Sequence, residues 1–404
     1  MSGEDAPGPL PLEGMLVLDF SQFLAGPMAA MRLGDLGARV IKIERPQGGD
    51  IGRRLAFAGV VEDGDTLSFH ITNRNKESYA ADLKNEDDRI GIRALVARAD
   101  VIIQNFRPGI MERLGFGYEA VAAINPGIVY ASVSGYGTEG PWKDRPGQDL
   151  LAQSLSGLPW LNGSADDPPV PVGIALADVI SSIHLASGIT AALLRRERTG
   201  LGGRVDTSLL ESMLDLQFEL LSAHLADPSI VVKRGARNTA HAFLPAPYGV
   251  YPTSDGYLAI AMTAVPELGA LIGLTALEQY TDPDSWWSEQ TPITRALADH
   301  LATRSTEHWL SILDAADIWC APVLTLPELV AHDGFRAIDM AQEVSRPGLD
   351  GAARVDIQTV RTPVRYDGRV LKNGRAAPRL GEHTEAIRAE FATTPHERAR
   401  EAAE

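Results

Sequence analysis

Asp178 is the residue whose type and surroundings most clearly could do chemistry. It is the one carboxylate in the uncharged segment at residues 172–184, and an apolar helix is predicted directly after it, over residues 185–194. An aspartate at a helix start commonly caps it, because its side chain accepts hydrogen bonds from the free amides of the first turn. The alternative is a catalytic carboxylate whose charge those amides stabilise. The local pattern alone favours the cap.

Other reactive groups are sparse. The single cysteine, Cys320, excludes a disulfide framework and a cysteine-based metal site, and its mostly apolar flanks predict a buried, inert thiol. The sequence has no HExxH motif and no clustered histidine ligands, so we expect no metal. The first predicted strand–helix loop lacks G-x-G-x-x-G, and no Walker A motif occurs, so a nicotinamide cofactor is unsupported. His184, six residues after Asp178, is predicted to be structural.

The composition limits the class of partner. The chain has 404 residues, 37 of them basic and 53 acidic, and its formal net charge of -16 argues against nucleic acid or an anionic membrane as the main partner. Residues 1–14 are acidic and rich in proline and glycine, which is unlike a signal peptide. We expect no apolar run of membrane-spanning length, and therefore a cytoplasmic protein without a membrane partner.

The elements that must hold Asp178 alternate between strands and helices. A strand, a glycine-containing loop, a helix and a second strand are predicted at 15–20, 21–27, 28–36 and 40–44, and then helices and strands alternate at 87–99, 101–104, 118–124 and 128–133. This rhythm predicts an α/β fold, a doubly wound parallel sheet with helices on both faces. Ligands of such sheets bind at the carboxyl ends of the strands.

The length predicts two domains, or one with a large insertion. A helix is predicted at 207–225. Turn-forming and aromatic residues then gather over 226–256, which is typical of a linker into a different domain. The region after it is predicted to hold a strand at 257–262, amphipathic helices within 290–317 and strands at 355–360 and 362–366.

Short segments in one consistent order link nearly the whole chain to a known family. They are residues 17–27 (VLDFSQFLAGP), 36–46 (LGARVIKIERP), 73–76 (NRNK), 82–84 (DLK), 99–109 (ADVIIQNFRPG), 113–115 (RLG), 125–126, 132–140, 172–184, 191–194, 198–205 (RTGLGGRV), 321–323 (APV) and 380–384 (LGEHT). The set resembles the family III CoA transferases, the CaiB/BaiF family, which includes formyl-CoA transferase, carnitine CoA transferase and α-methylacyl-CoA racemase. Each segment is weak alone, but the ordered set is strong.

The resemblance implies a fold and an assembly. It implies a large Rossmann-like, CoA-binding domain over residues 1–225, completed by residues 325–404, with a smaller α+β domain and its linkers inserted at 226–324. It also implies that two chains interlock as a homodimer, which the residue patterns alone do not indicate. Acyl-CoA and a carboxylate are then the substrates, and CoA is a carrier and not a resident cofactor.

The resemblance also implies where CoA binds. Its phosphates and adenine need cationic side chains, backbone amides and apolar surfaces. The positions carried over are Ala25, Arg45, Ala81, Asp82, Leu83, Lys84, Asn105, Phe106, Arg107, Arg113, Gln148 and Asp149. Solvated surface charge stays open for Arg45, Lys84 and Arg113. Phe106 fits a core position equally well, and Asp149 fits a helix cap.

By the same resemblance, Asp178 falls where the family has its catalytic aspartate. The implied reaction passes CoA between two carboxylic acids through a mixed anhydride and an aspartyl-CoA thioester on this side chain. Backbone amides near Asp178, or the helix start, are expected to stabilise the oxyanion. With the family match, the catalytic role is favoured over the cap.

Gln148 separates two activities within the family. The racemases pair a histidine with the aspartate to exchange the α-proton, and that histidine falls at the position of Gln148. Glutamine is no proton-transfer base near neutral pH, so a transferase is favoured over a racemase or epimerase. A non-catalytic acyl-CoA-binding protein is the third, least favoured hypothesis, because the aspartate is present.

The chain also departs from formyl-CoA transferase. Leu24 stands where that enzyme has a glutamine in the first loop, and residues 230–260 lack its run of glycines. Arg234, Arg237 and His241 occupy that region. They could meet an acceptor carboxylate, but a surface loop is favoured.

Overall fold

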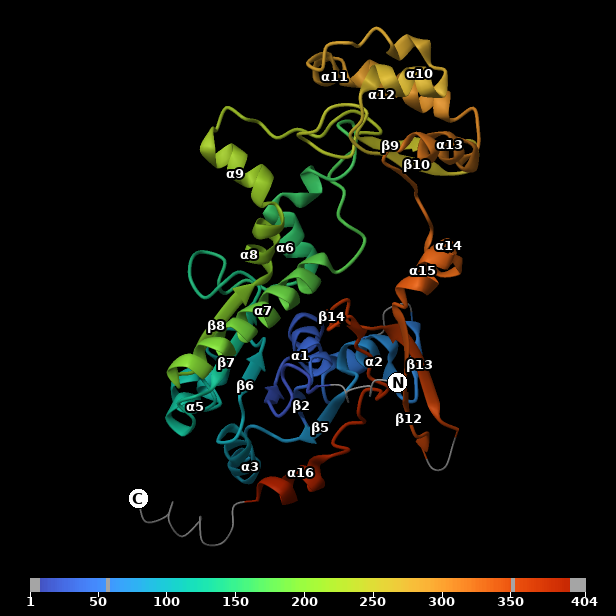
Figure 1. Cartoon of the computed structure of the whole chain (residues 1–404). Coiled ribbons are helices and arrows are strands. Elements are labelled where there is room, and N and C mark those ends of the chain that lie inside the picture. Colours follow the sequence, from blue (N-terminus) through green and yellow to red (C-terminus); the bar gives the residue numbers. More distant parts are fainter. Residues whose placement is uncertain (1–7, 56–58, 350–352, 393–404) are drawn as a thin grey trace. The chain divides into compact units, whose positions relative to one another are not determined.

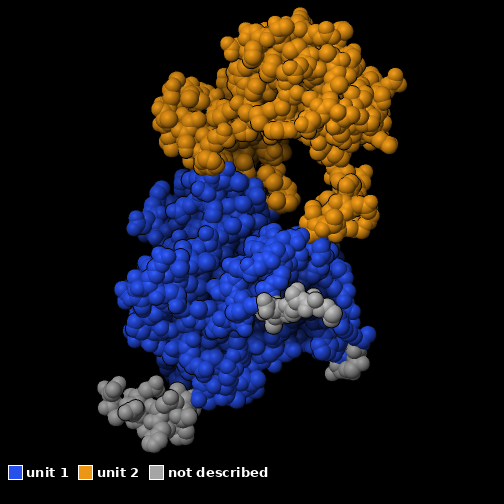
Figure 2. Space-filling model, in the orientation of Figure 1, with its two compact units in different colours: residues 1–152, 175–216, 339–404 blue, residues 153–174, 217–338 orange. Residues whose placement is uncertain are grey.

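The computed structural model describes residues 8–55, 59–349 and 353–392, so the first half of the acidic segment 1–14 lies outside the described residues. The chain divides into two compact units (Figure 2). Unit 1 comprises Met1–Ala152, Ala175–Leu216 and Asp339–Glu404, and unit 2 comprises Gln153–Ile174 and Gln217–Ile338. Each unit has its own apolar core.

Six parallel strands form the central sheet of unit 1, which confirms the predicted α/β fold (Figure 1). Across the sheet they are β5 (Lys76–Ala80), β2 (Arg39–Glu44), β1 (Leu16–Asp19), β6 (Val101–Gln104), β7 (Val129–Ser134) and β8 (Gly203–Ser208). The chain runs outward from β1 to β5, returns to β6, and runs outward again to β8. The topological switch point therefore lies between β1 and β6, where ligands of such sheets bind.

Alternation along the strands gives the sheet two different faces. Leu18, Ile41 and Ile102 belong to an apolar core that also holds residues of α3 (Glu86–Val96), α5 (Tyr118–Ile124) and α16 (Thr384–Phe391). Their strand neighbours Asp19 and Lys42 point to the opposite face, although both are fully buried. These two stand opposite each other in the β1–β2 register, so the sheet itself brings a carboxylate beside an ammonium.

Four helices of unit 1 lie close to one another. They are α1 (Ala25–Asp35), α2 (Leu67–Asn73), α7 (Leu176–Thr199) and α8 (Leu209–Leu216). α1 packs against α7 and α2, and α7 packs against α8, β7 and β8. Short elements between them include β3 (Val61–Glu62), β4 (Asp65–Thr66), α4 (Ile110–Arg113) and α6 (Asp149–Ser156).

α7 corrects two expectations. Among the described residues it is a helix of 24 residues that is long and apolar enough to cross a membrane, so the expectation that no run has that length is wrong. One such helix is weak evidence for a span, because core helices pass the same test, and Leu185 and Ile189 are buried in unit 1. α7 also begins before Asp178: its N-cap residue is Ala175, so Asp178 lies in the first turn and is not the cap residue.

The single helix predicted over 207–225 is wrong. The chain forms strand β8, then α8, then a separate helix α9 (Phe218–Ala226) in unit 2. β8 is an edge strand that is hydrogen-bonded to β7 alone, and Arg204, Asp206 and Thr207 are not buried. Its polar residues hide the apolar pattern that identifies a buried strand.

Unit 2 is built around a three-stranded antiparallel sheet. Its strands are β9 (Gly249–Pro252), β10 (Tyr257–Ile260) and β11 (Cys320–Pro322), and its helices include α10 (Val265–Ile272), α11 (Ser285–Ser288), α12 (Gln290–Leu301), α13 (Thr306–Leu313), α14 (Leu326–Ala331) and α15 (Asp333–Ile338). Leu258, Leu268 and Leu297 are fully buried in its core.

Residues 153–174 belong to unit 2, although we expected them in the large domain. Arg234 explains this placement: its guanidinium donates hydrogen bonds to the carbonyls of Asn162 (3.1 Å) and Pro168 (2.9 Å) and also bonds the carbonyl of Asp167. The Arg234 side chain is thereby occupied in holding this segment. The units also divide at residues 217 and 339, whereas we expected divisions at 226 and 325.

The C-terminal segment belongs to unit 1. It forms a hairpin of β12 (Ala341–Arg346) and β13 (Val355–Val360), a short pair β14 (Arg365–Tyr366) and β15 (Arg369–Val370), and then α16. Ile387 and Phe391 of α16 complete the core that is built on β1 and β2.

Candidate active site

A pocket of about 550 Å³ lies wholly within unit 1. Loops that follow β1, β6 and β7 line it, together with the start of α7. Leu24, Asn105 and Gly135 represent these three loops, and Asp178 represents α7. The pocket therefore stands at the carboxyl ends of the strands, beside the switch point, where the sequence predicted a ligand.

Asp178 is a partly buried carboxylate in the wall of this pocket. Burial raises its pKa to about 7, and the negative charge of Asp149 adds to the shift. Among the described residues no cation forms an ion pair with Asp178. A carboxylate that is destabilised in this way is more basic than an ordinary aspartate and is about half ionised at pH 7.

Asp149 performs the capping role that the sequence offered for Asp178. Its Oδ1 accepts hydrogen bonds from the backbone amides of Ala177 (2.7 Å) and Asp178 (3.2 Å). A side chain from 28 residues upstream therefore satisfies the first turn of α7 and brings a second carboxylate near the first. The expected oxyanion donors near Asp178 are in part engaged with Asp149.

The start of α1 offers other amide donors. Ala25, the first residue of α1, lines the pocket, and no side chain among the described residues caps this helix. Gly26 follows it, and Pro27 has no amide hydrogen. The positive end of the α1 dipole and the first-turn amides are therefore available to an anionic ligand.

Most of the candidates carried over by resemblance come together in two places. The pocket is lined by Ala25, Asn105, Phe106, Arg107, Gln148, Asp149 and Asp178. A smaller cavity of about 30 Å³ is lined by Arg45, Ala81, Leu83 and Phe106, among others. Phe106 lines both, so the two cavities are neighbours along this side chain.

Three candidates line neither cavity. Asp82 and Lys84 are exposed, and the Asp82 carboxylate accepts a hydrogen bond from the Lys84 amide (3.0 Å) in a tight turn. Arg113 is exposed at the end of the short helix α4. Lys84 and Arg113 therefore lie on the surface, which fits the interpretation of these residues as solvated surface charges.

Asn105 fastens the first loop. Its side-chain amide donates to the Gln22 carbonyl (2.7 Å), and its Oδ1 accepts from the Gln22 amide (2.8 Å). Both functional groups of Asn105 are therefore engaged with the backbone. Its contribution to the pocket is to hold the loop after β1 against the loop after β6.

Two cations and an aromatic side chain of this pocket were not predicted from the sequence. Lys143 and Arg145 line it with Arg107, and none of the three has an ion-pair partner among the described residues. Phe23 lines it too, with a left-handed backbone (φ 67°). Lys143 and Arg145 stand just before Gln148, so their proximity to that position was a usable signal. The conformation of Phe23 has no sequence signal, because it depends on distant partners.

Residues with alternative roles have local partners. His184 pairs with Asp215 (3.1 Å) and contacts the Ser212 hydroxyl (3.1 Å), which joins α7 to α8. Cys320 is only partly buried, contrary to expectation. Burial and Asp314 raise the pKa of its thiol to about 11, which keeps it protonated near neutral pH.

In unit 2, Arg237 is exposed and His241 lies 3.7 Å from Glu219. The Arg234 guanidinium is engaged with the carbonyls of residues 162–168. These contacts fit the surface-loop interpretation of this region.

Comparisons with known proteins agree with the site. Residues 12–384 match the family model described as CoA-transferase family III. The succinate–glutarate CoA-transferase of Agrobacterium fabrum is 32% identical and covers 95% of this chain and 96% of its own. The acetyl-CoA:oxalate CoA-transferase of Acetobacter aceti is 35% identical with the same coverages. The crystal structure of a CaiB/BaiF family protein from Brucella suis superposes with a TM-score of 0.81 at 31% identity, over 95% of this chain and 100% of that one.

Proposed function

This chain belongs to CoA-transferase family III, and from that premise we propose that it moves CoA from an acyl-CoA thioester to a free carboxylic acid through a covalent intermediate on Asp178. The observation that carries the proposal is a carboxylate in the pocket wall that no described cation neutralises and whose pKa is raised to about 7. A carboxylate of this kind is a better nucleophile than a solvated or ion-paired one.

In the first half-reaction an oxygen of Asp178 attacks the thioester carbonyl. The carbon–sulfur bond breaks, CoA leaves as a thiolate, and an acyl–aspartyl anhydride remains. The thiolate then attacks the Asp178 carbonyl carbon, which releases the donor carboxylate and leaves an aspartyl-CoA thioester. Atoms and charge balance without a proton or an outside reagent.

The second half-reaction runs the same steps in reverse with a new acid. The acceptor carboxylate attacks the aspartyl thioester, which forms a new anhydride and frees the thiolate. Attack of the thiolate on the acyl carbonyl gives the new acyl-CoA and restores Asp178. Each step develops negative charge on a carbonyl oxygen, and the uncapped start of α1 is the proposed source of stabilising amides.

CoA recognition is proposed for the two neighbouring cavities. Arg107, Lys143 and Arg145 supply positive charge for phosphate oxygens. Arg45 and Phe106 lie at the smaller cavity with Ala81 and Leu83, a combination of charge and apolar surface that suits a phosphorylated nucleoside.

The alternative is an α-methylacyl-CoA racemase or epimerase, which needs a second base. Gln148 lines the pocket immediately before Asp149, and glutamine cannot take a proton near neutral pH. This observation favours the transferase. A racemase would carry solvent deuterium into the α-carbon of a branched acyl-CoA without an acceptor acid, and we expect no such exchange.

The names of the relatives suggest which acids to test first. Their names include succinate, glutarate and oxalate, which are all dicarboxylates. We propose succinyl-CoA as the first donor to test, against a panel of mono- and dicarboxylic acids, with products separated by mass spectrometry.

The decisive experiment traps the intermediate. Wild-type protein incubated with a competent acyl-CoA and hydroxylamine is expected to carry a hydroxamate at Asp178, detected in the peptide that contains it. Asp178→Ala should lose transfer activity by about a thousandfold or more. Asp206→Asn changes a carboxylate of strand β8 that does not line the pocket and is the control. Transfer without any adduct at Asp178 would remove the covalent mechanism.

A homodimer is also proposed. Large apolar side chains are exposed in both units: Leu194 and Leu201 in unit 1, and Phe218 and Leu225 in unit 2, are each more than half exposed. Exposed apolar surface of this extent supports an interface with a second copy. Sedimentation equilibrium is expected to give twice the mass of the chain, and a monomer would contradict the proposal.

A further inference from the structure

The loop after β1 forms one wall of the pocket, and side chains from other elements hold its backbone. Phe23, Leu24 and Ala25 line the pocket directly. Phe23 has a left-handed backbone conformation, which residues other than glycine and asparagine rarely adopt. Its ring is about half exposed. Its own packing is therefore a weak reason for the conformation, and the reason must come from the groups that bind this loop.

Asp50 joins two parts of that wall. Its Oδ1 accepts hydrogen bonds from the backbone amides of Phe23 (3.2 Å) and Gly52 (2.8 Å), which lie on separate segments and both line the pocket. The Asp50 side chain itself is almost completely buried. One carboxylate oxygen therefore fixes the first loop against the segment that follows β2.

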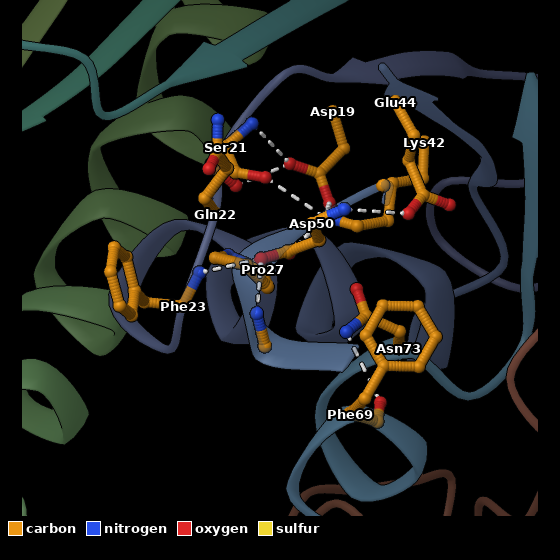
Figure 3. A network of polar contacts seen from close by, with 12 residues as sticks. Asp19, Ser21, Gln22, Phe23, Pro27, Lys42, Glu44, Asp50, Phe69 and Asn73 are labelled. Atoms are coloured by element: carbon orange, nitrogen blue, oxygen red, sulfur yellow. Dashed lines mark hydrogen bonds and ion pairs between the residues drawn. The ribbon is translucent and has the colours of Figure 1, made fainter. Parts of the chain in front are cut away.

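Lys42 holds the other end of this arrangement. Its Nζ lies 2.8 Å from Asp50 Oδ2 and donates a hydrogen bond to the Ser21 carbonyl (2.9 Å) (Figure 3). Burial by itself would lower the pKa of Lys42, but Asp19 and Asp50 outweigh it and raise the pKa to about 12. The ammonium is therefore charged at any physiological pH, and it binds both the loop and the carboxylate that binds the loop.

A second buried ion pair, Lys76 with Asp19, lies next to the first. Lys76 Nζ lies 2.8 Å from Asp19 Oδ2 and donates to the Pro27 carbonyl in the first turn of α1 (2.8 Å). Asp19 also accepts hydrogen bonds from the amide and hydroxyl of Ser21. Two ammonium groups and two carboxylates are thus buried together. Such a cluster is an expensive way to gain stability, because apolar residues of the same volume often stabilise as well or better.

We propose that Lys42 and Asp50 are positioning residues for the acyl-CoA substrate. As a pair they fix the left-handed turn at Phe23 and the segment at Gly52 as one wall of the pocket, while Lys76 holds the start of α1 through the Pro27 carbonyl. This inference rests on the proposed function, because it takes the pocket to be the acyl-CoA site. Neither side chain lines the pocket that holds Asp178, although Asp50 lines the smaller cavity, and we assign to each a role through the backbone that it holds.

The test replaces the pair with apolar residues of similar size, Asp50→Leu with Lys42→Met. Loss of both charges leaves no unpaired ion, but it frees the amides of Phe23 and Gly52 and the Ser21 carbonyl. We expect KM for the acyl-CoA to rise about tenfold while kcat at saturation stays within about twofold, because the loop and not Asp178 has been released. A fall in kcat alone, or an unchanged KM, would overturn the proposal.

The matched control removes an equally buried pair that does not touch the pocket. Arg74 and Asp35 form a bidentate ion pair (Nη2 to Oδ2, 2.7 Å), and both side chains are at most 5% exposed. Asp35→Leu with Arg74→Met should change the unfolding midpoint to a similar degree and leave KM within about twofold. An equal rise of KM in this control would show that the effect is general loosening and would overturn the inference.

Asp50→Asn with Lys42→Met tests the two amide bonds. It restores an oxygen acceptor for Phe23 and Gly52 without a charge, and KM should return to within about threefold of the wild type. Failure of this rescue would contradict the role given to Asp50 Oδ1.

Two further measurements test the inference without depending on turnover. Calorimetric binding of CoA in an Asp178→Ala background does not depend on turnover, so it tests this inference even if the wild type proves to transfer no CoA. The Asp50→Leu with Lys42→Met change should weaken CoA binding about tenfold relative to Asp178→Ala alone, and an unchanged affinity would overturn the inference. Hydrogen exchange of the wild type needs no variant: the amides of residues 21–24 should be protected far longer than those of the exposed loop at 138–147, which lies on the same pocket. Equal, fast exchange in both loops would overturn the proposal.

Discussion

The ionisation of Asp178 gives the active site a characteristic pH dependence. The nucleophile must be ionised, and burial together with Asp149 raises its pKa to about 7. We expect kcat/KM for the acyl-CoA to fall about tenfold for each pH unit below 7 and to level off above it. A pH–rate profile of the wild type from pH 5 to 9 checks this.

Asp149→Asn is the matched variant for that profile. Asparagine keeps an oxygen acceptor for the two amides but removes the charge, so the inflection should move to lower pH. An unchanged inflection would mean that Asp149 has no part in setting the pKa of Asp178.

The same ionisation affects stability. The pKa of Asp178 in the folded state lies above the unfolded value of 3.8. The stabilising contribution of this group to the free energy of unfolding is therefore complete below pH 3.8 and is lost as the pH rises towards 7. Asp178→Asn should therefore unfold at a higher temperature than the wild type above pH 7, and lose that advantage in acid. Thermal unfolding of both proteins at pH 5 and pH 8 measures the difference.

At the residue scale, the sequence identified Asp178, Gln148 and Asp149 because they stand in short ordered segments. It could not show that Asp149, and not Asp178, caps α7, because the two bonds span 28 and 29 residues. The role of Lys42 could not be predicted from the sequence for another reason. A lysine inside a buried strand has a role only when the register puts Asp19 opposite it.

The start of α7 is the element whose local stability sets the position of the nucleophile. Asp149 Oδ1 satisfies the first-turn amides at Ala177 and Asp178. Asp149→Ala should destabilise unit 1 by about 1–2 kcal/mol, and Asp149→Asn by much less, because asparagine is an equally good capping side chain. Denaturant titration of the two variants provides the comparison, and equal losses would contradict the capping role.

Elements were predictable where an apolar pattern repeats without interruption. β1, β2, β6 and β7 were found for this reason, and α1 was found within a few residues. β5 and β8 are the two edge strands of the sheet, and their polar residues suppress the pattern. α7 was predicted too short because its glycine, serine and threonine residues mask a continuous helix that packing on α1 and α8 completes.

At the scale of the molecule, buried ion pairs fasten the C-terminal segment of unit 1 to its N-terminal half. Arg346 binds Asp63 (2.7 Å) and Asp65 (3.2 Å), and these side chains are at most 10% exposed. Arg346→Met removes one partner from each carboxylate, while Arg379 still pairs with Asp63 and Arg53 still pairs with Asp65. The loss of these charged hydrogen bonds should cost about 2–3 kcal/mol of unfolding free energy. Denaturant unfolding measures that cost.

Arg354→Met is the control for this measurement. Arg354 pairs with Asp356 on the surface and is 61% exposed, so its loss should cost less than about 0.5 kcal/mol. A small effect at Arg346, equal to that of the control, would mean that these pairs do not hold the segment.

The placement of α16 has a consequence for how the protein is made. Ile387 and Phe391 fill the core that is built on β1 and β2, although they are synthesised long after those strands. The strands synthesised first therefore have an incomplete apolar face until α16 has been made. Residues 217–338 of unit 2 are complete well before that moment and can fold during synthesis. A premature stop just before residue 384 would thus leave residues 217–338 of unit 2 able to fold but unit 1 without part of its core. Chaperones and proteases would then act on the unfinished unit 1.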